Sequence, residues 1–140
     1  MLRQNARWAV GEYKFDINGM SQDARQDAAE AARTTLKFKD GYGMELAGDM
    51  LRARDMVETQ ISAVSLDQDL ALGDLPSGKA AAKHYATQRA AAVDALKKIS
   101  AHYKSHADHF IATEMLYRNT EERNAGRINP YKDGTATVKY

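Results

Sequence analysis

The second half of the chain carries a line of side chains at alternating spacings of four and three residues. Such a line is the seam of an α-helix that packs lengthwise on a partner, because these positions share one helix face. Its members are Tyr85, Arg89, Ala92, Leu96, Ile99, Tyr103, His106, Phe110, Thr113 and Tyr117. No set of residues with catalytic spacing lies on this seam. The pattern therefore predicts a protein that works by packing against other protein.

Composition supports a helical domain and argues against some partners. The 140 residues are 44% hydrophobic with only two prolines, which suits one domain of close-packed helices. Twenty basic residues against 19 acidic ones leave a net charge of +1, so the clustered basic excess that nucleic acids require is missing. The chain has no cysteine, which excludes a disulfide framework, a thiolate metal site and a cysteine nucleophile.

Residues 1–8 contain no apolar stretch followed by a small-residue cleavage site, and the sequence has no apolar run of 18 residues. We therefore expect no membrane span, and export, if it occurs, without a cleaved signal peptide.

A helical rhythm also fills the first half of the chain. Ser21 is a suitable N-cap, and apolar positions follow it with helical spacing to Val64. Gly41 and Gly43 interrupt the rhythm, at a cost of about 1 kcal/mol each. We predict one kinked helix from Ser21 to Leu66, with a clean break into two helices as the alternative.

Turn residues at 67–77 separate this helix from a second one that runs to about Arg123. The predicted fold is an all-α, long antiparallel helical hairpin over 21–125, with an extended arm at 1–20 and an extended tail at 126–140. Residues 44–69 hold six acids against two arginines, and 77–125 hold eight basic residues against five acids, so the two helices carry opposite charge. Complementary charge favours them as neighbours.

Alternating side chains near both termini leave two interpretations open. Residues 9–17 place Tyr13, Phe15 and Ile17 on one side, and residues 135–140 alternate as well. They form either two separate extended arms or a terminal pair of strands. Trp8 lies outside both helices and could anchor the N-terminal arm to the hairpin or to a partner.

Two motifs raise the question of chemistry. Residues 73–79 have the spacing of a phosphate-binding loop, but Ala80 stands where the hydroxyl residue should be and Pro76 removes an amide donor. We interpret the segment as a hairpin turn with its cap. His102, His106 and His109 share one helix face, yet the sequence shows no second group of metal ligands. We therefore expect no metal, no cofactor and no enzymatic activity, with a histidine-based metal enzyme as the weakest alternative.

Two long helices around a short glycine-containing turn, closed by Tyr117-x-x-x-Glu121, resemble the WXG family of small type VII (ESX) secretion substrates and their associated proteins. The resemblance covers about residues 24–122, and the family's Trp-x-Gly is absent from the turn. It implies a secreted protein whose export signal contains Tyr117 and Glu121, and whose partner is the secretion machinery.

We expect a homodimer or heterodimer of helical hairpins, with Leu96, Ile99, Tyr103 and Phe110 in its interface. The alternative function is a structural protein of a virion, such as a phage head–tail connector or tail component.

Overall fold

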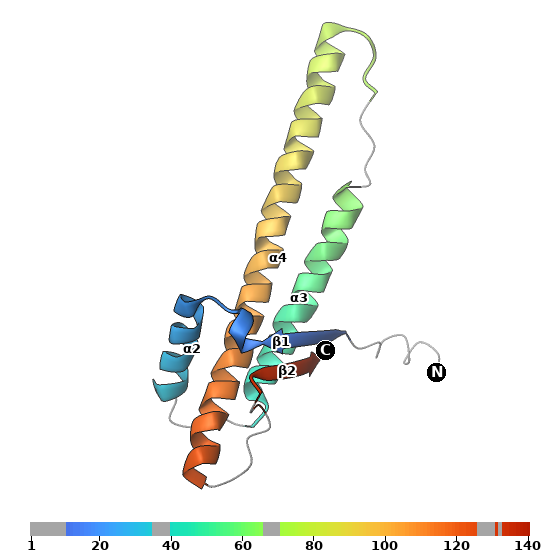
Figure 1. Ribbon diagram of the computed structural model, residues 1–140. Helices are drawn as coiled ribbons and strands as arrows, with labels where there is room; N and C mark the ends of the chain where they lie inside the picture. Colours follow the sequence, from blue (N-terminus) through green and yellow to red (C-terminus); the bar gives the residue numbers. More distant parts are fainter. Residues whose placement is uncertain (1–10, 35–39, 66–70, 126–130, 132) are drawn as a thin grey trace, which may run out of the picture. The chain divides into compact units, whose positions relative to one another are not determined.

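The chain is mostly helical. The computed structural model describes residues 11–34, 40–65, 71–125, 131 and 133–140, with the side chains of α4 described as far as Asn119. The elements in order are β1 (Glu12–Asp16), the 3-10 helix η1 (Ile17–Gly19), α2 (Gln22–Thr34), α3 (Tyr42–Ser65), α4 (Pro76–Ala125) and β2 (Thr135–Lys139) (Figure 1). The two long helices, α3 and α4, pack together, which confirms the coarse prediction of paired helices.

The predicted kinked helix from Ser21 to Leu66 is instead two helices, the alternative that the glycines left open. Ser21 caps α2 as predicted, and its hydroxyl oxygen accepts a hydrogen bond from the Ala24 amide at 3.2 Å. α2 ends at Thr34 and α3 begins at Tyr42. Between them Gly41 has φ = 83°, a left-handed conformation that glycine adopts without strain and that a continuing helix does not contain.

Of the two interpretations of the terminal segments, the structure confirms the pair of strands and not the two separate arms. β1 and β2 are antiparallel, with Tyr13 opposite Val138 and Phe15 opposite Ala136. These four side chains are buried or half-buried, while Glu12, Lys14, Asp16, Thr135, Thr137 and Lys139 are exposed. The alternation read from the sequence therefore gives the correct inner face. The small β1–β2 ribbon also makes the fold mostly helical rather than strictly all-α.

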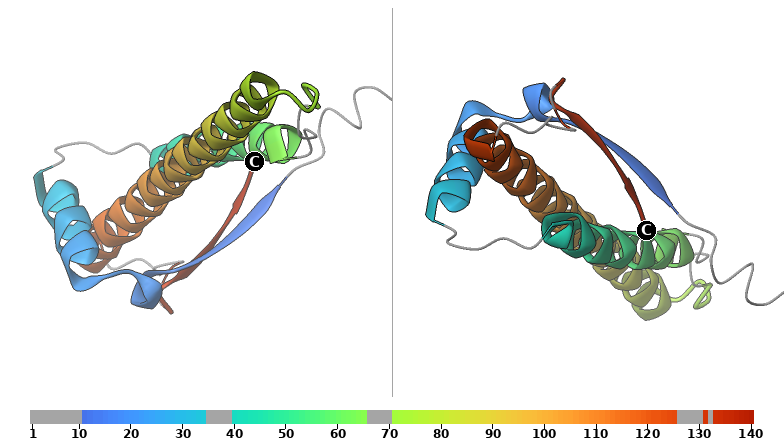
Figure 2. Two further views of the ribbon diagram at one scale, coloured as in Figure 1. Left: turned by 90° about the horizontal axis from the view of Figure 1, so that it is seen from above. Right: turned by 90° about the horizontal axis from the view of Figure 1, so that it is seen from below.

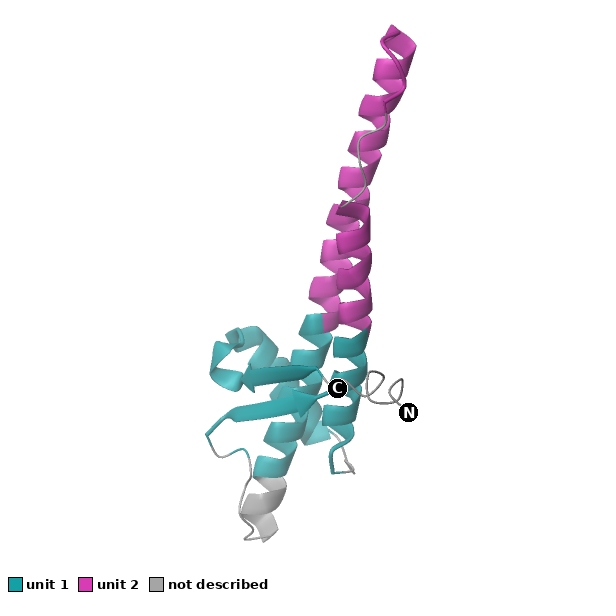
Figure 3. Cartoon of the chain, turned by 90° about the vertical axis from the view of Figure 1, so that its right-hand side faces the viewer, with its two compact units in different colours: residues 1–52, 104–140 teal, residues 53–103 magenta. Residues whose placement is uncertain are grey.

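The contacts divide the chain into two compact units. Unit 1 contains residues 1–52 and 104–140, and unit 2 contains residues 53–103, so α3 and α4 each contribute to both (Figure 3). Among the described residues, the hydrophobic core belongs to unit 1. Its buried members are Phe15, Ala28, Ala47, Leu51, Ala107, Ile111, Ala112, Met115, Ala136 and Val138.

In unit 1, α4 is covered on several sides. α2, α3 and the β1–β2 ribbon lie around it (Figure 1 and Figure 2). All five consecutive residues from Ile111 to Met115 are buried, which a single seam cannot produce because consecutive residues turn about 100° around the helix. Small residues let the helices approach closely: Gly43, Ala47 and Gly48 are buried on α3, and Ala28 and Ala32 on α2.

One buried carboxylate fixes the start of α3. Glu114 of α4 is fully buried, and its Oε1 accepts hydrogen bonds from the amides of Gly43 at 3.0 Å and Met44 at 3.4 Å. These amides lie in the first turn of α3, where no carbonyl of the same helix can reach them. The residue before α3 is Gly41, which has no side chain to serve as a cap. Glu114 caps α3 from the neighbouring helix and places its charge at the positive end of the helix dipole.

Glu114 also holds two other segments. The Tyr131 hydroxyl donates to Oε2 at 3.4 Å, and burial together with the charge of Glu114 raises the pKa of Tyr131, so its phenol stays protonated. Arg118 Nε lies 3.9 Å from Oε2, and its Nη1 lies 3.3 Å from Asp40 Oδ2. One region of α4, around the Glu114 carboxylate, is thus tied to the start of α3, to the segment before β2 and to Asp40.

We expect Glu114→Gln to lower the free energy of unfolding by about 1–3 kcal/mol, because a neutral amide is a weaker acceptor for the α3 amides and removes the buried negative charge beside Arg118, which keeps its pair with Asp40. Urea unfolding followed by circular dichroism measures this change. Glu45→Gln is the matched control, since Glu45 also lies in the first turn of α3 but is exposed, and its loss should cost less than about 1 kcal/mol. Equal effects of the two substitutions would contradict the role given to Glu114.

Candidate interaction surface

In unit 2, α3 and α4 meet along a seam that is only half-buried. The half-buried side chains of α4 follow the four-three spacing: Ala82, Ala86, Arg89, Val93, Leu96 and Tyr103. Ala53, Val57, Ile61 and Val64 line the facing side of α3. Among the described residues of unit 2, only Ser100 is fully buried, and it is polar. Its hydroxyl donates to Glu58 of α3 at 2.5 Å, which joins the two helices.

The observed seam consists of two lines of residues along α4, and one of these lines differs from the prediction. Arg89, Leu96 and Tyr103 lie on it as predicted, but their companions are Ala86, Val93 and Ser100. The predicted companions, Tyr85, Ala92 and Ile99, are exposed. Each is one residue earlier in the chain, which places it about 100° away around the helix.

The residues predicted to form an intermolecular interface fall into different places. Leu96 and Tyr103 are half-buried in the seam of unit 2, and Ile99 is 43% exposed. Phe110 packs against the core of unit 1. Of the four, Ile99 is therefore the side chain most available to another protein.

Unit 2 also exposes most of the large apolar side chains on the described surface. Met56 is 72% exposed and Leu75 is 71% exposed. Leu72, Tyr85 and Ile99 are exposed as well, and outside unit 2 only Tyr42 joins them among the residues that the structure describes. Tyr85 has the guanidinium of Arg89 6.0 Å from its ring centre. Of the large apolar side chains that are exposed among the described residues, all but Tyr42 therefore belong to unit 2.

The residues predicted as an export signal lie near the end of α4. Tyr117 is half-buried, and position 121 lies on the same helix. The side chain of Glu121 is outside the described residues, as is Trp8. Glu114, which lies one turn before Arg118, was not among the residues predicted from the sequence. Glu114 follows the buried Ala107 by seven residues, so the two lie on the same face of α4. An acidic residue at such a position was the signal that could have revealed its role.

The phosphate-loop lookalike is a helix start. α4 begins at Pro76, and the Lys79 amide donates to the Leu75 carbonyl at 3.0 Å. A Cβ atom on Gly78 would lie 2.1 Å from the carbonyl oxygen of Leu72, so the preceding turn packs directly on this glycine. A carbonyl oxygen there repels phosphate, and the close packing accounts for Gly78.

The three histidines considered as metal ligands, His102, His106 and His109, do not share a ligand set. His102 and His106 are exposed, and the ring of His109 makes an edge contact with that of Phe110, with 6.1 Å between centroids. In the part of the chain that the structure describes, no three His, Cys, Asp or Glu side chains converge as metal ligands would. No described helix combines the length and hydropathy that a bilayer span requires.

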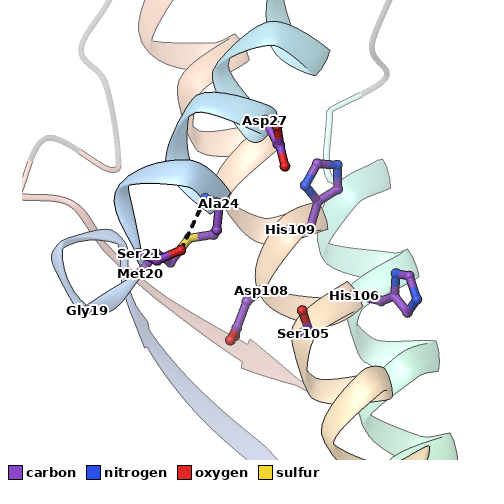
Figure 4. Close-up of a pocket in the computed structure, with 9 residues that line it drawn as sticks. All are labelled: Gly19, Met20, Ser21, Ala24, Asp27, Ser105, His106, Asp108 and His109. Carbon is purple, nitrogen blue, oxygen red and sulfur yellow. Dashed lines mark hydrogen bonds between the residues drawn. The ribbon is translucent and has the colours of Figure 1, made fainter.

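Unit 1 has a pocket of about 480 Å³ where the start of α2 faces α4 (Figure 4). The side chains of Asp27 and His109 point toward each other across it, and His106 points away. Asp108 lines the pocket but is already engaged, since it accepts hydrogen bonds from the Tyr13 hydroxyl at 2.5 Å and from Lys104 Nζ at 3.1 Å.

The bonds around Asp108 serve the fold. Burial and the hydrogen bond to Asp108 raise the pKa of Tyr13, which keeps the phenol a donor. Burial disfavours the charge of Lys104, but the hydrogen bond and charge of Asp108 outweigh it and raise the pKa of Lys104. Asp108 thereby ties β1 to α4.

We expect Lys79→Ala to leave the thermal unfolding midpoint unchanged, with or without ATP and magnesium, because the Leu72 carbonyl oxygen occupies the space beside Gly78 that a phosphate would need. Differential scanning fluorimetry of both proteins provides the measurement. A stabilisation of the unsubstituted protein by ATP that Lys79→Ala abolishes would contradict this interpretation.

Comparisons of this chain with sequence-family models, with curated proteins and with solved structures find no match.

Proposed function

We propose that this protein is not an enzyme and acts by packing its helical hairpin against another protein, as a dimer. The layout that resembles type VII secretion substrates suggests the setting: an exported protein that leaves the cell without a cleaved signal peptide. The observation that carries the proposal is that unit 2 contains two long helical segments and, among its described residues, no buried apolar side chain.

The physical argument concerns the stability of unit 2. Helices in proteins are stabilised chiefly by burial of an apolar face, since isolated helices are marginal in water. In unit 2 the seam is half-buried, and the only fully buried described residue is Ser100. Apolar burial contributes about 25 cal/mol per Å², and Met56, Leu75 and Ile99 leave much of their apolar area in water. A partner that covers unit 2 would supply the missing burial.

The export part of the proposal rests on Tyr117 and Glu121. They lie one helical turn apart on α4 and therefore share a face. Tyr117 is half-buried, which leaves part of its ring available for recognition. We propose that this pair is read by the secretion machinery, as the resemblance implies.

The first test asks whether unit 2 depends on a partner. Amide hydrogen exchange should slow in residues 53–103 by at least about tenfold between dilute and concentrated protein, because only the dimer protects these helices, whereas unit 1 with its own core should change little. Exchange followed by mass spectrometry, with sedimentation velocity on the same samples, measures both quantities. A monomer at all concentrations whose unit 2 is as well protected as unit 1 would overturn the proposal.

The second test concerns export. Tyr117→Ala and Glu121→Ala should each reduce secretion by at least about tenfold in a bacterium with a type VII system, because each removes half of the recognised pair. Glu122→Ala is the matched control, since it removes a neighbouring carboxylate outside the Tyr-x-x-x-Glu spacing. Thermal unfolding of each purified variant separates lost recognition from lost folding.

Normal secretion of both variants, together with a dimer in solution, would favour the alternative of a structural protein in a larger assembly.

A further inference from the structure

Three places in the sequence join an asparagine or an aspartate to a glycine: Asn18-Gly19, Asp40-Gly41 and Asp133-Gly134. At such a step the glycine nitrogen can attack the side-chain carbonyl carbon, because a residue without a Cβ atom leaves the backbone free to bring the two atoms together. The product is a five-membered succinimide ring, which water then opens. The surroundings of the three steps differ in the structure.

At the Asp133-Gly134 step both reacting groups are engaged. Asp133 accepts hydrogen bonds from the Thr135 hydroxyl at 2.8 Å and from the Thr135 amide at 3.1 Å, and these bonds lower the pKa of Asp133. The ionised carboxylate is a poor electrophile, because attack would add negative charge to a group that already carries it. The Gly134 amide donates to the Tyr131 carbonyl at 2.9 Å, so the nucleophile is held as well.

At the Asp40-Gly41 step the side chain is paired. Asp40 Oδ2 lies 3.3 Å from Arg118 Nη1. An aspartate carboxyl is ionised at neutral pH, so this one is also a poor electrophile.

The Asn18-Gly19 step has neither kind of protection. Asn18 carries a neutral amide, whose carbonyl carbon accepts a nucleophile and whose nitrogen can leave as ammonia. Both residues are exposed, and no hydrogen bond from the described residues holds the Asn18 side chain. A Cβ atom placed on Gly19 would meet nothing within 4 Å apart from the local backbone, so the chain has room to move there.

These two residues belong to η1, which is a single 3-10 turn without a buried residue. The Asn18 amide donates to Asp16 Oδ1 at 2.9 Å, and the Met20 amide donates to the Ile17 carbonyl at 3.2 Å. A turn that buries no side chain opens locally at a small cost in free energy, and its amides then become available. Opening of η1 gives the Gly19 nitrogen access to the Asn18 side chain while the core stays folded.

We propose that Asn18 is a modification site, at which the folded protein converts asparagine to aspartate and isoaspartate. The Gly19 nitrogen bonds to Cγ of Asn18 and the Cγ–Nδ2 bond breaks. The Gly19 amide proton and the side-chain NH₂ group leave together as ammonia. One water molecule then opens the succinimide, at the side-chain carbonyl to give aspartate or at the backbone carbonyl to give isoaspartate. The reaction requires neither export nor a partner.

The products change the junction between β1 and α2. A carboxylate at position 18 lies close to that of Asp16, whose Oδ1 accepts the hydrogen bond from the backbone amide of Asn18. Like charges at short range repel each other. Isoaspartate also adds its β-carbon to the main chain. Gly19 and Met20 line the pocket beside α2 (Figure 4), so the modification alters one wall of that pocket.

Peptide mapping of the folded protein tests the site. During incubation at neutral and mildly alkaline pH, Asn18 should convert at least about tenfold faster than Asp40 or Asp133 forms isoaspartate, because only at Asn18 can the reacting atoms meet. Mass spectrometry detects the mass difference between an amide and a carboxyl group, and chromatography separates the two products. Circular dichroism verifies that the protein stays folded. A protein that retains its Asn18 amide would overturn the proposal.

Gly19→Ala tests the nucleophile. The variant should fold, because Gly19 has open space around its Cβ position and is not one of the glycines with positive φ. Conversion of Asn18 should slow at least about tenfold, since a Cβ atom restricts the backbone conformations from which the nitrogen reaches the carbonyl carbon. An unchanged rate would overturn the route through the Gly19 nitrogen.

Asp133→Asn is the matched control, because it places the same Asn-Gly sequence in a different structural setting. The Gly134 amide remains bonded to Tyr131, and the Gly134 carbonyl accepts the Ile17 amide at 2.9 Å. Position 133 should therefore convert at least about tenfold more slowly than Asn18 in the same molecule. Equal rates at the two positions would show that sequence alone sets the reaction, and would overturn the structural argument.

Discussion

The Glu114 carboxylate inside unit 1 is the interaction on which the arrangement of that unit depends. It accepts two amides at the start of α3 and the hydroxyl of Tyr131, and it lies near Arg118, which pairs with Asp40. A buried carboxylate is costly unless hydrogen bonds satisfy it, so the segments that supply these bonds are held together by the same requirement. Small residues on α3 let the helix start approach closely enough for the bonds to form.

The two units differ in how far they bury their apolar side chains. Unit 1 surrounds α4 with α2, α3 and the ribbon, which gives it a core of its own. The described part of unit 2 has two helical segments and a short turn, so one side of each helix remains in water and exposes Met56, Tyr85 and Ile99. This contrast is the physical basis of the proposed function: one unit carries the fold, and the other carries the surface for a partner.

The residues that first suggested a catalytic, phosphate or metal site either make structural contacts or lie apart from one another. Asp108 holds β1 through Tyr13, Gly78 packs under the Leu72 carbonyl, and the α4 histidines do not converge with other ligands among the described residues. These contacts show what each of the three features does in the fold, and the proposed function rests on unit 2 instead.

The sequence by itself determined the local structure. Helical spacing gave α4 nearly to its ends, Ser21 gave the start of α2, and alternation gave the inner face of β1, because these depend on the 3.6- and 2-residue periods and on caps that act within a few residues. It did not determine the pairing of β1 with β2, the break at Gly41, or which column of α4 faces α3. Two lines of residues on α4 have similar apolar character, so periodicity could not distinguish them. One contains Tyr85, Ala92 and Ile99, and the other contains Ala86, Val93 and Ser100. Only the tertiary structure decided that choice, because the neighbours of a helix come from segments distant in sequence. For the same reason, no local pattern around Gly43 could show that the carboxylate of Glu114 caps α3.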